Sequence, residues 1–302
     1  ANEERVIGVL LGDAGRSMEA EFSRLAEAFS AGFRLRPLKA GEDVPEDVDV
    51  LFVIGNKDLK DFDLFPVDQY IMKGGRALFA VDGVRMDLLR GLLARKLEAN
   101  PTLDMLASYG VTVKRELALD KYCQNFRLPT QLFGQIMWQV LEKYPYWITI
   151  AGQNVAKDNP ITAHFSGLDL YWASPLEFNI KGETRAEVLV RTTPDGWTVN
   201  EEPFDTNPQQ AQMFIYMDHP NKGAIPLAAS LTGPLTSYFQ GKSIPKREGE
   251  KREWREIVGS VKDARIIVVG DSDFASDLIE FTEARYNLTF LTNAAEWLGN
   301  SE

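Results

Sequence analysis

The sequence predicts an α/β protein built around a doubly wound, mostly parallel β-sheet, with a mixed α+β region in its middle. Short, continuous apolar runs recur along the first third of the chain, and residues 6–11 form the first of them. Such runs are typical of strands buried on both faces of a parallel sheet. Patterns with helical spacing separate the runs, and the strand-then-helix pattern returns after residue 261. Strands that alternate with helices of this length favour a parallel sheet covered on both faces.

The first predicted helix follows a turn at residues 12–15. Ser17 is of a type that caps helix N-termini, and Glu19 and Glu21 suit the positive end of the helix. Gly32 is expected to end it. The apolar residues of one helical face are Met18, Phe22, Leu25, Ala26 and Phe29.

Three further strands are predicted in this part of the chain, at residues 33–38, 48–55 and 77–81. A short helix with an apolar face lies between the last two and closes at Gly74-Gly75. After Asp82-Gly83, helical spacing of leucines predicts another helix over residues 88–97. The leucines concerned are Leu88, Leu89, Leu92, Leu93 and Leu97.

Asn100 and Pro101 have the residue types of an N-cap and a first helical position, so they predict the start of the next helix. This helix should end at Gly110, and residues 111–119 are again strand-like.

The composition changes between residues 121 and 260, where aromatic residues and prolines are frequent. Strands are predicted at 186–191 and 225–231, and a helix at 131–144. Residues 242–256 mix charges densely and predict an exposed loop leading into a short helix. We therefore divide the chain into an α/β domain (1–120), a mixed α+β region (121–260) and a strand–helix unit (261–302) that returns to the sheet.

Composition excludes several classes of function. Asp and Glu number 44 against 33 Lys and Arg, and the net charge of −11 disfavours nucleic acid as a partner. Cys123 is the single cysteine, which excludes an intrachain disulfide and favours a buried apolar role for its side chain. No apolar run reaches the about 18 residues of a membrane span. The chain begins with a polar segment and without Met, so we expect it to be a piece of a longer protein.

No cofactor or metal site is predicted. The two histidines, His164 and His219, are far apart and lack the spacing of metal ligands. Gly241-Lys242-Ser243 resembles the end of a P-loop, but Thr236 occupies the position that requires glycine. ATP hydrolysis is therefore expected from a partner.

Two turns at predicted strand ends carry the candidate ligand-binding residues. At the first turn, backbone N–H groups at a helix start could hold an anion with help from Arg16, although a tight turn with an N-cap is favoured. The second turn resembles the nucleophile turn of the GDS-type esterases, but no histidine follows Ser272, and hydrogen bonding of Asp271 and Asp273 to backbone N–H groups is preferred. The candidate residues are Gly12, Asp13, Gly15, Arg16, Ser17, Asp82, Gly270, Asp271, Ser272 and Asp273.

An aromatic group in the middle region has two interpretations. Core or interface packing is favoured for it, and stacking on a sugar or a peptide is the alternative. The residues are Tyr144, Tyr146, Trp147, Tyr171 and Trp172.

Several segments, in order along the chain, resemble the auxiliary components of ABC-type gliding-motility transport systems, the GldG-like family. They include residues 67–78, with Gly74-Gly75-Arg76, then Tyr109-Gly110-Val111, 226–228 and 236–239. The clearest match is residues 265–274, followed by Asn287 and residues 291–298.

The resemblance implies a three-layer α/β fold like that of class I glutamine amidotransferases and their intraflagellar-transport relatives, without their catalytic cysteine. It also implies a domain at the extracytoplasmic face of the bacterial inner membrane. Such a domain is anchored by membrane segments outside this sequence and works with an ABC permease and ATPase. No catalytic residues are carried over, since catalytic residues do not define the family.

The predicted function is therefore that of a non-catalytic auxiliary or binding subunit of an ABC-type transport system. A hydrolase, either an esterase or a carbohydrate-active enzyme, is the alternative, with its site in the loops around Asp13, Asp82 and Asp271–Asp273. A structural scaffold, paired with itself or a partner through an aromatic surface near residues 144–147, is the third hypothesis.

Overall fold

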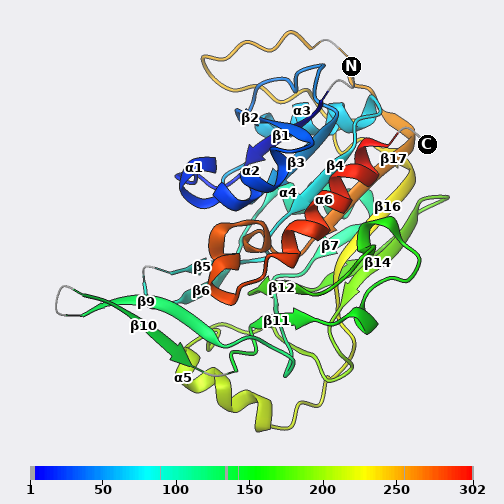
Figure 1. Cartoon of the computed structure of the whole chain (residues 1–302). Helices are drawn as coiled ribbons and strands as arrows, with labels where there is room; N and C mark the ends of the chain where they lie inside the picture. Colours follow the sequence, from blue (N-terminus) through cyan, green and yellow to red (C-terminus); the bar gives the residue numbers. More distant parts are fainter. Residues whose placement is uncertain (1–3, 89, 133–134, 142, 255, 301–302) are drawn as a thin grey trace.

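The fold is α/β, with a large mixed sheet of seven strands at its centre (Figure 1). The computed structural model describes residues 4–88, 90–132, 135–141, 143–254 and 256–300. The sheet order is β14-β16-β17-β4-β3-β1-β2. Its strands are β1 (Arg5–Leu11), β2 (Phe33–Leu38), β3 (Val50–Ile54), β4 (Ala77–Ala80), β14 (Arg185–Arg191), β16 (Pro226–Thr236) and β17 (Ser260–Val269).

Five neighbouring strands, from β2 to β17, run parallel, and β16 is antiparallel to both of its neighbours. The register aligns Ile54 with Ala80 and Ala80 with Val269, so these strands end at one common edge. β14 and β16 come from the middle of the chain and extend this sheet.

Helices cover both faces of the sheet. α2 (Ser23–Phe29) and α6 (Tyr286–Gly299) pack on one face, where Phe29 and Leu291 meet Phe52 of β3 in one apolar cluster. α3 (Asp61–Met72) and α4 (Pro101–Tyr109) pack on the other face against Val53 and Val268. Because alternate strand residues point to opposite faces, both layers of helices bury apolar strand side chains.

The remaining elements are short. They are α1 (Met18–Glu21), α5 (Pro208–Ala211), β5 (Val84–Asp87), β6 (Leu93–Lys96), β7 (Val111–Val113), β8 (Leu117–Leu119), β9 (Phe126–Leu132), β10 (Gln135–Leu141), β11 (Trp147–Ile150), β12 (Leu168–Tyr171), β13 (Leu176–Phe178) and β15 (Trp197–Val199). Five 3₁₀ turns complete the described part of the chain: η1 (Gly152–Asn154), η2 (Pro160–Thr162), η3 (Gln212–Tyr216), η4 (Asp273–Ala275) and η5 (Asp277–Thr282).

The predicted N-caps and the predicted end of α4 are confirmed, but the helix expected to end at Gly32 ends at Phe29, with Ser30 as its C-cap. The Ser17 side chain accepts a hydrogen bond from the Ala20 backbone N–H at 3.1 Å, and Asn100 caps α4 in the same way through Leu103 N–H. Gly110 ends α4 in the left-handed conformation, with φ of 119°. The first helix is divided at Phe22, which is the C-cap of α1 and the N-cap of α2.

The predicted helix at 88–97 is wrong. β6 lies in this range and pairs antiparallel with β5, which precedes it, and Gly91 between the two strands has φ of +65°. Leu88 and Leu93 are 45 % and 39 % exposed whereas Leu92 and Leu97 are buried, so these leucines do not form one buried face as a helix would require. Leu89 lies outside the described residues.

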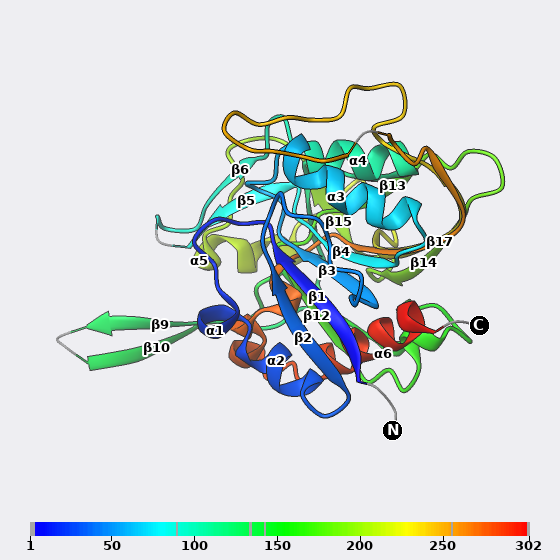
Figure 2. The ribbon, with the colours of Figure 1, turned by 90° about the horizontal axis from the view of Figure 1, so that it is seen from above.

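The predicted helix at 131–144 is also wrong where the structure describes it. The antiparallel strands β9 and β10 pair instead, with Phe126 opposite Leu141, and the hairpin projects from the body (Figures 1 and 2). Pairing with residues 126–132 gives hydrogen-bond partners to the backbone N–H and C=O groups, which in a helix would have bonded to one another. Residues 133–134 and 142 are outside the described part.

Residues 242–254 form a loop, and the short helix expected there is absent from the described residues up to 254 and from 256 onwards. The guanidinium of Arg252 donates to the carbonyls of Pro245 and Phe62 and lies over the Phe62 ring. Side-chain contacts to α3 therefore hold this loop without a helix.

The aromatic group of the middle region packs in the core. Tyr144, Tyr146, Trp147, Tyr171 and Trp172 are all at most 3 % exposed and share one apolar cluster. This arrangement confirms the core-packing interpretation. It also means that residues 144–147 do not form the exposed patch on which the scaffold hypothesis depended.

Candidate functional site

Four loops meet at the carboxyl-terminal edge of the sheet. They follow β1, β3, β4 and β17, and the parallel register brings them side by side. In open α/β sheets this edge is where ligands bind. Three of the loops carry Asp13, Asp82 and Asp271–Asp273, which the sequence analysis selected. The fourth carries Lys57, which it missed.

Lys57 is the centre of the cluster. Its Nζ contacts Asp82 Oδ2 at 2.7 Å and Asp13 Oδ2 at 3.1 Å, and its backbone N–H donates to Asp13 Oδ1 at 3.1 Å. Burial alone would lower the pKa of Lys57, but the two carboxylates outweigh this effect and raise it. Burial likewise works to raise the pKa of Asp82, and the Lys57 charge outweighs it and lowers that pKa. The pair is therefore ionised at neutral pH.

Ser272 is bound to this ion pair. Its hydroxyl donates to Asp82 Oδ2 at 2.6 Å, the same oxygen that contacts Lys57, and its backbone N–H donates to Asp82 Oδ1 at 2.9 Å. The residue is 1 % exposed. No contact between a histidine and Ser272 occurs among the described residues, and His219 stacks on Trp197 with ring centroids 3.8 Å apart. Ser272 thus has neither an accessible hydroxyl nor a histidine base.

Asp271 and Asp273 differ in their partners. Asp271 is fully buried and accepts from the backbone N–H groups of Tyr171 (2.7 Å) and Asp273 (2.8 Å), as the strand-end capping interpretation expected. Asp273 instead binds Arg16 Nη2 at 3.2 Å. Burial raises the pKa of both carboxyl groups; neighbouring carboxylates add to the effect at Asp271, and Arg16 opposes it at Asp273.

Arg16 lies where the cluster reaches the surface. Besides Asp273, its guanidinium contacts Glu21 at 3.1 Å and Asp13 at 3.8 Å, and it lies over the Phe22 ring. Arg16, Glu21 and Asp273 line a cavity of about 390 Å³ together with residues of the 276–281 segment. Three carboxylates already compensate the Arg16 charge, so this arrangement does not favour the anion that the sequence analysis considered.

The glycines of the candidate set allow close packing of backbones. A Cβ on Gly12 would lie 2.1 Å from the Gly55 carbonyl oxygen, and one on Gly270 would lie 2.1 Å from the Ser174 carbonyl oxygen. Gly15 has φ of +83° in the turn, and Ser17 caps α1. Gly15 and Ser17 therefore shape the loop and make no direct contact with the Lys57 ion pairs in the described structure. A ligand-binding role for the whole set stays a prediction.

Sequence reasoning missed Asn56 and Lys57. Asn56 is fully buried, and its side chain donates to the Asp82 carbonyl and accepts from the Asp82 N–H, both at 2.9 Å. Both residues directly follow the apolar run of β3, the same signal that selected Asp82 after β4. Within the described residues, no group of three or more His, Cys, Asp or Glu side chains could hold a metal ion.

A family model described as "ABC-type uncharacterized transport system" matches residues 4–300. The chain belongs to this ABC transport auxiliary family. The name and description of the family refer to an auxiliary component of an ABC-type transport system. No helix in the described ranges is long and apolar enough to cross a membrane.

A curated relative, an uncharacterized protein of Borreliella burgdorferi, is 26 % identical over 207 residues. The match covers 66 % of this chain and 39 % of that protein, so the chain spans about two fifths of the length of the curated relative it matches.

Among solved structures, the N-terminal domain of mmIFT52 has a TM-score of 0.51 at 11 % identity, covering 94 % of this chain and 98 % of that one. This likeness concerns the fold alone. A putative ThuA-like protein from Bacteroides uniformis has a TM-score of 0.46 at 13 % identity, covering 99 % and 93 % of the two chains.

Cys123 lies apart from the cluster and is half-buried next to β11. Burial raises the pKa of its thiol to about 12. Because the thiolate is the reactive form, we expect the folded chain to react with DTNB at pH 8 at least about a hundredfold more slowly than an unperturbed thiol. The chain unfolded in guanidinium chloride is the control, and equal rates in the two states would contradict the expectation.

Proposed function

We propose that this chain is a non-catalytic binding subunit of an ABC-type transport system of the GldG-like, gliding-motility kind. In this proposal it lies at the extracytoplasmic face of the bacterial inner membrane. Membrane segments elsewhere in the full-length protein anchor it there, and it works with separate permease and ATPase subunits. Its sheet, with helices on both faces, would be of the class I glutamine amidotransferase-like or flavodoxin-like type. The match of the family model over residues 4–300 supports the transport part of the proposal.

The proposal that the chain is non-catalytic rests on the burial and the hydrogen bonding of Ser272. A serine nucleophile needs an accessible oxygen and a base that can take its proton. Ser272 is buried, and its hydroxyl is bonded to a carboxylate oxygen already paired with Lys57 at 2.7 Å. The cluster is therefore suited to joining the four strand-end loops rather than to attacking a substrate.

We expect no turnover of p-nitrophenyl esters or glycosides above the buffer background. We also expect the Ser272→Ala variant to be indistinguishable from the wild type in this assay, because no bond-breaking step uses the Ser272 hydroxyl. Hydrolysis is followed by release of p-nitrophenolate. A turnover that is present in the wild type and abolished by Ser272→Ala would overturn the non-catalytic assignment.

The transport part is tested separately with the full-length protein in its native membrane. Affinity purification in mild detergent should co-purify an ABC permease and its ATPase in a fixed ratio. Recovery of the full-length protein without either subunit would contradict the partnership.

A hydrolase with its site at Asp13, Asp82 and Asp271–Asp273 is the second candidate. The gathering of these carboxylates at one edge favours it, together with the 390 Å³ cavity beside Asp273. If this second function holds, the wild type should hydrolyse one of these substrates. The Asp273→Asn variant should then lose that activity, whereas Ser272→Ala should retain it.

A further inference from the structure

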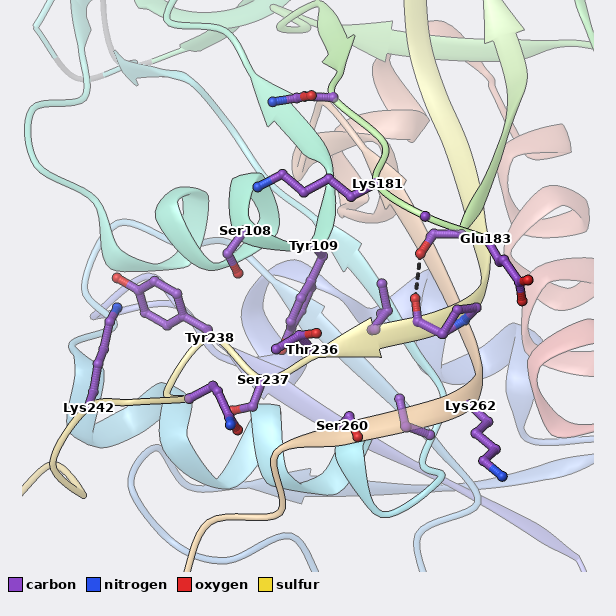
Figure 3. Close-up of a pocket in the computed structure, with 17 residues that line it drawn as sticks. Ser108, Tyr109, Lys181, Glu183, Thr236, Ser237, Tyr238, Lys242, Ser260 and Lys262 are labelled. Atoms are coloured by element: carbon purple, nitrogen blue, oxygen red, sulfur yellow. Dashed lines mark hydrogen bonds between the residues drawn. The ribbon is translucent and has the colours of Figure 1, made fainter.

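A second, larger cavity lies at the opposite edge of the sheet from the carboxylate–lysine cluster. It is a groove of about 800 Å³, within the size range of small-molecule sites. Its walls come from the end of α4, the 179–184 loop, the end of β16 with the turn that follows, and the start of β17 (Figure 3). We call this cavity the polar groove.

A buried carboxylate fixes one wall of the polar groove. Asp68 of α3 is 0 % exposed and accepts hydrogen bonds from the hydroxyls of Tyr109 and Ser237, both at 2.6 Å. It also accepts from the backbone N–H of Tyr238 at 3.0 Å. Asp68 of α3 therefore joins the turn after β16 to the end of α4, so the wall is formed in advance of any ligand.

Two lysines are directed to the same end of the polar groove. Figure 3 shows Lys181 and Lys242 reaching toward the end where Ser108 and Tyr238 lie, whereas Lys262 and Glu183 lie at the other end. The Lys242 Nζ is 3.5 Å from the centroid of the Tyr238 ring, which holds its charge at the rim. Within the described residues neither Lys181 nor Lys242 has an ion-pair partner, in a chain whose net charge is −11. The two ammonium groups at this end are therefore available to an anionic group.

The rest of the lining combines hydrogen-bonding side chains with apolar ones. Thr236, Gln240 and Ser260 are exposed there, and Leu235 and Val261 also line the groove. Hydroxyl and amide side chains can both donate and accept, which matches the hydroxyl groups of a sugar.

We propose that the polar groove binds an acidic oligosaccharide, with a carboxylate between Lys181 and Lys242 and sugar hydroxyls along Thr236, Gln240 and Ser260. The transport proposal does not require this site. The Gly241-Lys242-Ser243 segment, which failed as a P-loop, here contributes a carboxylate-binding lysine.

The test is isothermal titration of the whole chain with trigalacturonate, with maltotriose as the neutral probe and triglutamate as the acidic peptide. We expect trigalacturonate to bind more tightly than the other two. The double variant Lys181→Gln/Lys242→Gln should weaken its binding about tenfold, since two exposed charge pairs are lost. Lys262→Gln makes the same charge change at the other end and should weaken binding less than about twofold.

Three results would overturn the proposal. One is the absence of trigalacturonate binding at millimolar concentration. Another is triglutamate binding as tightly as trigalacturonate, which would show a peptide or purely electrostatic site. The last is an equal loss of affinity in Lys262→Gln and the double variant. None of these outcomes depends on whether the full-length protein co-purifies with a permease and an ATPase.

Discussion

The Asp82→Ala variant is expected to lower the free energy of unfolding by about 3–5 kcal/mol, because it leaves a buried lysine charge with reduced compensation. Asp82 binds Lys57 Nζ at 2.7 Å and receives two hydrogen bonds from Ser272. The change also removes the side-chain link from the loop after β4 to Ser272 in the loop after β17, whereas the backbone of residue 82 keeps its bonds to Asn56. Urea unfolding followed by circular dichroism measures the effect.

The pH dependence of this effect follows from the lowered pKa of Asp82. A carboxyl group whose pKa is lowered by folding stabilises the fold above its unfolded pKa of about 3.9, and this contribution is lost as the pH falls through the folded pKa. The difference between wild type and Asp82→Ala should therefore be largest near neutral pH and shrink below about pH 4.

Asp47→Ala is the matched control for Asp82→Ala. Asp47 also pairs with a cation, Arg36, but both side chains are more than 40 % exposed. Exposed ion pairs contribute little, so this variant should show only a small fraction of the Asp82→Ala effect. Equal effects of the two variants would mean that the carboxylate–lysine cluster does not hold the strand-end loops together.

The Trp147→Ala variant should be similarly destabilising, by about 3–5 kcal/mol, because it opens a cavity in the middle of a buried aromatic cluster. Trp147 is 0 % exposed, and its ring centroid lies 4.9 Å from that of Phe126, 5.4 Å from Tyr171 and 5.5 Å from Trp172. Chemical unfolding monitored by near-ultraviolet circular dichroism measures the loss.

Trp147→Phe separates packing from hydrogen bonding. The indole N–H of Trp147 is buried without a hydrogen-bond partner in the described structure, so phenylalanine removes no hydrogen bond. We expect this variant to cost well under half as much as alanine, since most of the ring volume is kept. If Trp147→Phe were as destabilising as Trp147→Ala, packing of the ring would not be the source of the stability.

The central sheet and the carboxyl-edge cluster could largely be predicted from the sequence, because both depend on local signals. Buried parallel strands are continuous apolar runs, and polar residues that follow such runs lie at a common edge. This reasoning placed Asp13, Asp82 and Asp271–Asp273 at the strand ends. It would also have placed Lys57, had the same rule been applied after β3.

The parts that could not be predicted depend on contacts between distant segments. Leucines at helical spacing over 88–97 indicated a helix, yet a helix also needs a surface to cover, and the sequence does not show whether one exists. The polar groove likewise joins Ser108, Lys181, Thr236 and Ser260, which come from four separate segments. In the same way, β9 pairs with β10 in a segment whose local sequence pattern weakly favoured a helix.

The position of β17 has a consequence for how the chain is made. β17 lies between β4 and β16, so a strand from residues 260–269 separates two strands that precede it in the sequence. During synthesis, β4 and β16 leave the ribosome before β17, and the backbone N–H and C=O groups on their facing edges are unpaired until it follows. Unpaired edges of this kind promote association between chains. The sheet is therefore completed only after residue 269 has emerged, and β4 and β16 have no partner on their facing edges until then.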